Sequence, residues 1–371
     1  MPWELAFIVA FGATLLLTPL AIRLAGRTGF YDHPIGYKGH SSPTPYLGGI
    51  AVVGGLLLAS TLFSRDSTAF VPIAVGAVVL LGVGTLDDRY GLGPLTRLVI
   101  EVAAAAVLFA GGIGWNLFAS DAINLILSVV FVAGVVNAYN LMDNMDGATG
   151  TVAAVSGAGL GVLAAAQGSP ELAAIGFALS GACAGFLPFN LASPARIFLG
   201  DGGSMPVGFV VAGLIMAMPG AGHLGWAFVP VAVVLVGLPA LDTTLVVISR
   251  LRRGAGVFTG GRDHLTHRLR AKLGSARRVA LVLGMSQAIF TAAGSVLVGQ
   301  GKSDAAFVST VLILIGVAIV ALLESPGWTP ATTEWSTKPL AVDELAVPEG
   351  EHQQSPDLHR AVGAAALVEG E

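Results

Sequence analysis

Aspartates in three short motifs are the residues of this sequence best suited to chemistry. The motifs are GTLDDRYG, NAYNLMDNMDG and RIFLGDGGS, and they contain Asp87, Asp88, Asp143, Asp146 and Asp201. Any single one of them is explained equally well as a helix cap. Five carboxylates at one face, however, repel one another unless a cation lies among them. Carboxylates favour a hard ion such as Mg²⁺, with Mn²⁺ as an alternative, and Mg²⁺ usually binds substrate phosphates too, so we predict phosphate chemistry.

Two loops supply candidate contacts for a phosphate. The loop from 249 to 274 contains Arg253, His264 and His267, and the two histidines lie one helical turn apart. They suit a phosphate or a metal ion, and the neighbouring Asp and Arg side chains favour the phosphate. The arginines of this loop are explained equally by topological anchoring. The first loop contains Lys38 and His40, and Lys38 is either a ligand or a further anchoring charge.

Membrane-spanning helices are predicted to position these residues. The chain is 54% hydrophobic and 11% charged, with a mean hydropathy of +0.79, whereas roughly a quarter of the residues of a soluble protein are charged. We predict an all-α polytopic membrane protein. A span needs roughly 20 apolar residues. The chain offers eleven such runs, at about 3–23, 47–64, 69–86, 95–112, 121–139, 151–167, 171–189, 205–219, 226–248, 278–298 and 304–323.

The basic residues indicate the orientation of these spans. If the first span runs inward, 17 of the 19 Lys and Arg residues lie on the inner side, and only Arg65 and Lys302 lie outside. Positive charge favours the cytoplasm, so we predict the N-terminus outside, the C-terminus inside and the active-site loops on the cytoplasmic face. This arrangement puts all five aspartates at inner ends of spans. An ion-coupled transporter would need acids near span centres, where only Glu101 and Asp242 fit.

A polar tail follows the last predicted span. Residues 324–371 contain nine acidic and two basic side chains, so we expect a disordered cytoplasmic tail after a membrane domain at 1–323. The single cysteine, Cys183, excludes an intrachain disulfide. We expect the protein in the plasma (inner) membrane, with a homodimer as one option for its assembly and no nucleic-acid partner.

Five motifs in order resemble the polyprenyl-phosphate N-acetylhexosamine-1-phosphate transferase family. They are DHPIGYKGH…PYLGG, GTLDDRYGL, NAYNLMDNMDG, PARIFLGDGGS and LDTTLVVISRLRRG…DHLTHRL. The family includes bacterial N-acetylglucosamine-1-phosphate transferases and the phospho-MurNAc-pentapeptide translocase. The resemblance implies that a polyprenyl phosphate attacks the β-phosphorus of a UDP-N-acetylhexosamine, giving polyprenyl-diphosphate-sugar and UMP. This would be the first membrane step in the synthesis of a cell-wall or surface polysaccharide, such as lipopolysaccharide, teichoic acid or arabinogalactan.

The resemblance also implies a role for each motif residue. Asp201 and Asp88 would hold Mg²⁺, and Asp87 would deprotonate the lipid phosphate. Asp146 would contact the uracil, and Phe198 would stack on it. The remaining substrate contacts would be Lys38, His40, Asn137, Asn140, Asp143, Arg253, His264 and His267. Whether Asp87 acts as a base or a carboxylate first attacks the sugar nucleotide stays open.

The sequence departs from the family pattern at three places. The usual three-histidine cluster reads His264-Leu265-Thr266-His267 here, Tyr37 stands where a basic residue often occurs, and Asn144 replaces a glycine between two aspartates. The consecutive-histidine signature of the pentapeptide translocase is missing from the sequence, which favours N-acetylglucosamine as the sugar. The alternatives are the same reaction on another UDP-N-acetylhexosamine or on UDP-MurNAc-pentapeptide and, from other classes, a transporter, a scaffold or an inactive homologue.

Overall fold

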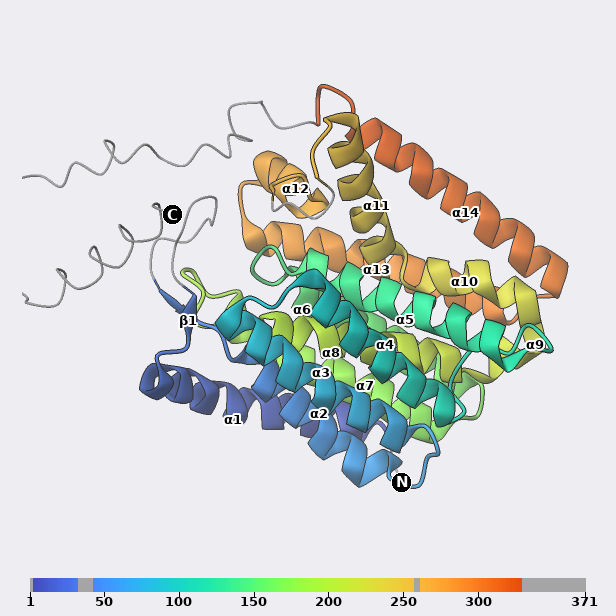
Figure 1. Cartoon of the computed structure of the whole chain (residues 1–371), viewed down its shortest axis with the longest axis horizontal. Helices are drawn as coiled ribbons and strands as arrows, with labels where there is room; N and C mark the ends of the chain where they lie inside the picture. Colours follow the sequence, from blue (N-terminus) through green and yellow to red (C-terminus); the bar gives the residue numbers. More distant parts are fainter. Residues whose placement is uncertain (1–2, 33–42, 257–260, 329–371) are drawn as a thin grey trace, which may run out of the picture. The chain divides into compact units, whose positions relative to one another are not determined.

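The protein is a bundle of helices in the part of the chain that the structure describes. The structure is a computed structural model that describes residues 3–32, 43–256 and 261–328 (Figure 1). Lys38 and His40, and the predicted tail from residue 329 onward, lie outside these residues. In order, the elements are α1 (Leu5–Thr28), β1 (Tyr31–Asp32), β2 (Thr44–Pro45), α2 (Gly48–Ser64), α3 (Phe70–Tyr90), α4 (Pro94–Ala110), α5 (Asp121–Met142), α6 (Ala148–Ala166), α7 (Pro170–Asn190), α8 (Asp201–Ala217), α9 (Pro219–Leu224), η1 (Gly225–Ala227), α10 (Phe228–Leu235), α11 (Gly237–Arg252), α12 (Leu265–Leu273), α13 (Ala276–Val298) and α14 (Lys302–Leu323).

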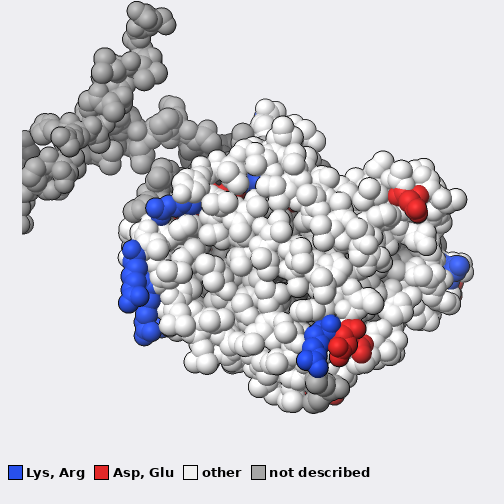
Figure 2. Space-filling view, turned by 60° about the horizontal axis from the view of Figure 1, so that its bottom comes forward, with Lys and Arg blue, Asp and Glu red and all other residues white. Residues whose placement is uncertain are grey.

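The helices agree with a membrane protein. Among the described residues, seven helices are long and apolar enough to cross a membrane, namely α1, α3, α5, α6, α7, α13 and α14. An eighth span results if α8 and the segment Pro219–Leu235, which are bent by 54°, count as one. Figure 2 shows a broad face that is mostly uncharged, with several Lys and Arg side chains along its left margin and a few charged side chains at its lower and right edges. The chain is therefore a multi-pass membrane protein, while the number eleven and the orientation stay predictions.

The predicted span at about 226–248 is not one continuous helix in the structure. The helix breaks between Leu235 and Gly237, so that α10 has eight residues and α11 starts anew. The side chain of Gln287 on α13 pairs with both sides of the break. Its Nε2 donates to the carbonyl of Leu235 at 2.9 Å, and its Oε1 accepts from the N–H of Leu238 at 3.3 Å. Backbone groups that a break frees inside a membrane must be paired by the protein, and Gln287 does this here.

α2 and α3 pack backbone to backbone against the start of α8. A side chain at Gly49 would collide with Gly202, and one at Gly84 would collide with the backbone of Asp201. Small residues let membrane helices approach this closely. α8 begins at Asp201, four residues before the predicted span at 205, so the aspartate of RIFLGDGGS lies on the helix itself.

A short hairpin positions the segment before α8. β1 and β2 pair antiparallel, and the N–H of Phe198 donates to the carbonyl of Pro45 at 2.8 Å. The N–H of Gly48 in turn donates to the carbonyl of Phe198 at 3.1 Å. Phe198 is therefore held against the start of α2, three residues from Asp201. β1 and α12 lie toward one end of the helices and α9 toward the other (Figure 1).

Candidate active site

Asp88 holds Asp201 in place at the start of α8. Its two carboxylate oxygens accept hydrogen bonds from the backbone N–H groups of Asp201 (2.9 Å) and Gly202 (3.1 Å). Unpaired N–H groups at a helix start carry partial positive charge, which a carboxylate stabilises. Asp88, predicted as a metal ligand, thus also caps a helix, and each of its oxygens keeps a lone pair for a cation.

Arg97 on α4 joins two of the predicted catalytic aspartates, and sequence reasoning missed this role. Its Nη1 lies 3.0 Å from Oδ2 of Asp87 and 3.2 Å from Oδ2 of Asp201. Asp87 also accepts a hydrogen bond from the N–H of Leu92. The sequence could have indicated this role, because Arg97 lies in the first turn of the helix that follows GTLDDRYG.

The two asparagines of NAYNLMDNMDG serve different partners. Nδ2 of Asn140 donates to Oδ1 of Asp201 at 2.7 Å and to Oγ of Ser204 at 3.1 Å. Nδ2 of Asn137 donates to Oε2 of the buried Glu101 at 2.6 Å. Asn140 therefore belongs to the Asp201 site, whereas Asn137 satisfies an acid within the helix bundle.

Asp143 and Asp146 lie in the turn after α5, next to the Asp201 site. Burial raises the pKa of Asp143 to about 8, and the nearby carboxylates of Asp201 and Asp146 add to the shift. Tyr46, another residue not foreseen from the sequence, lies in the same surroundings. Burial and the charge of Asp88 raise its pKa. The edge of its ring meets the half-buried ring of Phe198 at a centroid distance of 5.9 Å.

The resulting acidic site comprises Asp87, Asp88, Asp143 and Asp201 with Arg97 and Asn140, and its chemistry fits Mg²⁺. Within the described ranges, no three His, Cys, Asp or Glu side chains form a complete metal cage. Mg²⁺ requires less, because it keeps several waters and binds through one or two carboxylates plus substrate phosphates. Oxygen donors outnumber the positive charge of Arg97, so a divalent cation is electrostatically favoured there.

The predicted histidines lie on a second site, where Asp242 of α11 holds His264. Nδ1 of His264 lies 2.9 Å from Oδ2 of Asp242, and the N–H of Leu265 donates to Oδ1 of Asp242 at 2.7 Å. The rings of His264 and His267 are 6.3 Å apart. Burial, followed by the charges of His264 and Arg262, lowers the pKa of His267 to about 4. Asp242 is fully buried, so it fixes the ring of His264 by contact rather than meeting a substrate.

Arginines and acids beside these histidines form the arginine network, which comprises Arg250, Arg253, Asp263, Arg268 and Glu324. Arg250 donates to both oxygens of Asp263 (2.7 and 3.0 Å), and Arg253 donates to one of them (2.9 Å). Burial alone would raise the pKa of Asp263, but the hydrogen bonds and charge of Arg250 lower it. Arg268, with no exposed surface, donates to Glu324 at 2.6 Å and to the carbonyl of Leu323. Arg253, predicted as a substrate contact, is thus also part of this scaffold.

One hydrogen bond connects the two sites. Oγ1 of Thr266 donates to Oδ1 of Asn144, which lies between Asp143 and Asp146. The other end of the same amide, Nδ2 of Asn144, donates to the carbonyl of Leu141 at 2.7 Å. The histidine segment, residues 264–268, is thereby attached to the turn that contains the predicted nucleotide contacts Asp143 and Asp146.

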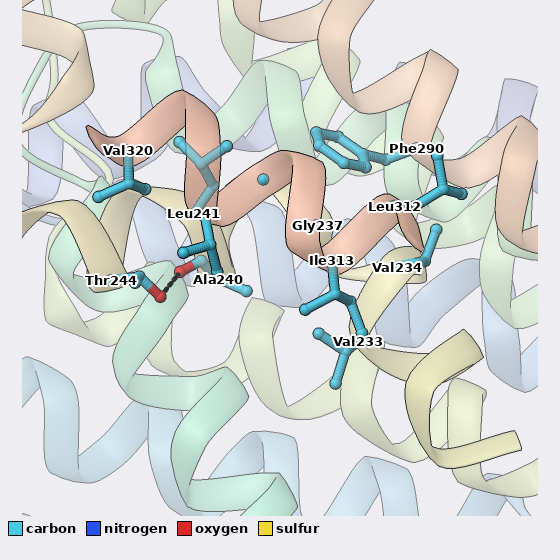
Figure 3. Close-up of a pocket in the computed structure, with 12 residues that line it drawn as sticks. Val233, Val234, Gly237, Ala240, Leu241, Thr244, Phe290, Leu312, Ile313 and Val320 are labelled. Carbon is cyan, nitrogen blue, oxygen red and sulfur yellow. Dashed lines mark hydrogen bonds between the residues drawn. The ribbon is translucent and has the colours of Figure 1, made fainter. Parts of the chain in front are cut away.

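An apolar cavity of about 90 Å³ shares no lining residue with either site. Its lining comes from α10, α11, α13 and α14 and includes Phe290, Leu312 and Val320 (Figure 3). Its one hydroxyl side chain, Thr244, donates to the carbonyl of Ala240 at 2.7 Å. The lining offers no charged group for a reaction.

Comparison with protein-family models matches residues 70–219 to glycosyl transferase family 4. This range contains Asp87, Asp88, Asn140 and Asp201. The decaprenyl-phosphate N-acetylglucosaminephosphotransferase of Mycobacterium tuberculosis (strain ATCC 25618 / H37Rv) is 32% identical over 337 residues, which cover 80% of this chain and 82% of that protein. The chain belongs to glycosyl transferase family 4.

Two further relatives of this glycosyl transferase family 4 member cover most of its length. The probable undecaprenyl-phosphate N-acetylglucosaminyl 1-phosphate transferase of Bacillus subtilis (strain 168) is 28% identical over 331 residues, or 86% of this chain and 90% of that protein. The undecaprenyl-phosphate alpha-N-acetylglucosaminyl 1-phosphate transferase of Escherichia coli O157:H7 is 28% identical over 346 residues, or 87% and 91%. The family expected from the five motifs is confirmed, and the protein is a sugar-1-phosphate transferase of the membrane.

Proposed function

We propose that this transferase moves N-acetylglucosamine 1-phosphate from UDP-N-acetylglucosamine to a polyprenyl phosphate. This would be the first membrane step in making a cell-wall or surface polysaccharide. Relatives from three bacteria carry this sugar in their names. The observation that carries the proposal is Asp201 at the start of α8, beside Asp87 and Asp88, with one arginine for three carboxylates.

The reaction exchanges one phosphoanhydride for another. An oxygen of the lipid phosphate attacks the β-phosphorus of the donor, the bond from that phosphorus to the bridging oxygen breaks, and UMP leaves with the bond electrons. If the lipid phosphate is still protonated, its proton passes to Asp87. Such transfer depends mainly on positioning and on neutralising charge, because no difficult covalent step falls to the protein.

The Asp201 site provides the position for the cation in this proposal. Asp201 and Asp88 would hold Mg²⁺, or Mn²⁺ in its place, with water and donor phosphates completing the shell. The bound ion would neutralise negative charge on the phosphates. Asn140 keeps the Asp201 carboxylate in its orientation through the bond at 2.7 Å.

The donor would lie between the turn after α5 and the histidine segment. Asp143 and Asp146 would contact the uridine, and Phe198 would stack on the uracil, since aromatic stacking on a base is worth roughly 1–3 kcal/mol. His264 and His267 would face the phosphates and the sugar, with Asp242 holding the first ring. Further contacts proposed for the donor phosphates and sugar are Lys38, His40, Asn137 and Arg253.

The decisive experiment is transfer by the purified protein in detergent. Polyprenyl phosphate and Mg²⁺ are combined with UDP-N-acetylglucosamine, other UDP-N-acetylhexosamines or UDP-MurNAc-pentapeptide, and UMP release and lipid product are followed. We expect UMP release that requires both lipid and Mg²⁺, with UDP-N-acetylglucosamine as the best donor. A different best donor would correct the sugar, and no transfer with any donor from folded protein would refute the proposed function.

A further inference from the structure

The hydrogen bond between Asn144 and Thr266 joins the turn after α5 to the segment that contains the two predicted histidines. Asn144 lies between Asp143 and Asp146, and Thr266 lies between His264 and His267. The positions are 122 residues apart in sequence, yet their side chains meet.

The physical chemistry of the contact explains why each residue suits the other. Thr266 has no exposed surface, so its hydroxyl needs a partner within the protein. A glycine at 144 would remove that acceptor. A histidine at 266 would bring a larger ring against the amide of Asn144. The amide is itself held at both ends, because its Nδ2 donates to the carbonyl of Leu141 at 2.7 Å.

Three contacts of the histidine segment, residues 264–268, differ in where they end. Asp242 holds His264, and Arg268 ties α12 to the end of α14 through Glu324. Neither of these contacts involves a residue of the acidic site. Only the contact of Asn144 with Thr266, among these three, ends on the turn that carries Asp143 and Asp146.

We propose that Asn144 and Thr266 are a positioning pair that sets the spacing between the nucleotide-side turn and the histidine segment, and thereby the affinity and selectivity for the UDP-sugar donor. This inference rests on the proposed function, in which the donor lies between these two segments. The pair acts on the donor and not on the lipid phosphate. It touches no reacting atom.

The test compares Thr266→Val, which removes the hydroxyl at nearly constant volume, with Thr266→Ser, which keeps it. Michaelis constants are measured for the UDP-sugar and for polyprenyl phosphate. We expect Thr266→Val to raise the donor KM by about 5- to 10-fold, as the loss of one buried hydrogen bond would, with the lipid KM within about 2-fold. Thr266→Ser should retain a donor KM close to that of the wild type.

A double-mutant cycle shows whether the two side chains act together. Asn144→Gly alone should raise the donor KM as Thr266→Val does, and the double variant should be no worse than either single one, because both remove the same contact. Thermal unfolding of each variant shows that it is folded.

Three outcomes overturn the inference while leaving the transferase intact. They are an unchanged donor KM in Thr266→Val, an equal rise in the lipid KM, and fully additive effects in the cycle. Wild-type protein that transfers no sugar would refute the proposed function, and this inference with it. The two failures are therefore distinguishable from the wild-type measurement alone.

Discussion

The acidic site and the arginine network differ in how their carboxylates are paired with arginines. In the acidic site, Asp87 and Asp201 share Arg97, while Asp88 accepts from the backbone N–H of Asp201 and Asp143 lies nearby. In the arginine network, Asp263 alone has two arginines, Arg250 and Arg253. The acidic site therefore keeps an excess of negative charge, whereas both carboxylates of the arginine network are paired with arginines.

The difference indicates that the acidic site is suited to bind a ligand, whereas the arginine network supports the side chains next to it. The pKa of Asp143 is raised because burial and neighbouring carboxylates oppose its charge, and the pKa of Asp263 is lowered because Arg250 outweighs its burial. A site that gains from an added cation suits Mg²⁺ and phosphates. A network whose carboxylates are already paired suits a rigid support for His264 and His267.

The largest expected effect is in the acidic site. Replacing Asp201 by Asn should lower kcat by roughly 10²–10³-fold, because a charge aimed at the reacting phosphates is lost. Without Mg²⁺, the melting temperature of this variant should be unchanged or slightly higher, because the charge of Asp201 no longer repels that of Asp87. Asp66→Asn, at an exposed residue paired loosely with Arg65 at 3.8 Å, is the control and should leave both unchanged. A normal kcat in Asp201→Asn would show that the reaction does not require the carboxylate of Asp201.

The arginine network should show the reverse, with a large effect on stability. Arg268→Met leaves Glu324, whose side chain is 5% exposed, without its closest partner. Breaking a buried pair costs about 3–5 kcal/mol, which thermal or denaturant unfolding in detergent would detect. The control is Arg252→Met, because Arg252 is 62% exposed and lies 3.7 Å from the same glutamate; its effect should be within about 1 kcal/mol. Equal losses in both variants would contradict the comparison.

The pH dependence of stability should have opposite signs in the two regions. For Asp143, the folded pKa of about 8 exceeds the ordinary 3.8, so its charge destabilises the metal-free fold as pH rises from about 4 to 8. Asp143→Asn should therefore raise the melting temperature at pH 8 in EDTA, with the gain vanishing near pH 4. Mg²⁺ should reduce that gain, since a bound cation offsets the charge.

Asp263 provides the matched case. Its pKa is lowered in the folded state, so the stability it contributes is present above its ordinary pKa and is lost as pH falls through the folded value. Asp263→Asn should lower the melting temperature at pH 7, and the loss should shrink on acidification. The distinction between the regions would be wrong if both substitutions changed the melting temperature in the same direction as pH rises.

The smallest expected effect concerns metal affinity. Arg97→Gln removes the cation that contacts Asp87 and Asp201, so the rise in melting temperature on adding Mg²⁺ should become larger by a few degrees at most. Arg89→Gln is the control, because Arg89 bonds the carbonyl of Gly29 instead of a carboxylate. An unchanged or smaller rise in Arg97→Gln would show that the arginine does not compete with the ion.

Sequence reasoning located the helices and the motifs well, because both are local properties. Apolar runs predict membrane helices by length alone, and α1, α5 and α14 lie where the runs lie. The failure at 226–248 has a physical cause. Hydropathy does not register a break when the flanking residues stay apolar, and the partner that satisfies the break, Gln287, is some fifty residues away.

The reactive groups were predicted from the sequence alone, since Asp87, Asp88 and Asp201 lie in three of five ordered motifs. Their partners were decided only by the tertiary structure. Arg97 lies 104 residues from Asp201, and Thr266 lies 122 from Asn144. Such contacts depend on how helices pack, which no local pattern encodes. The sequence thus specified which side chains could react, and the packing of the helices decided which charges they face.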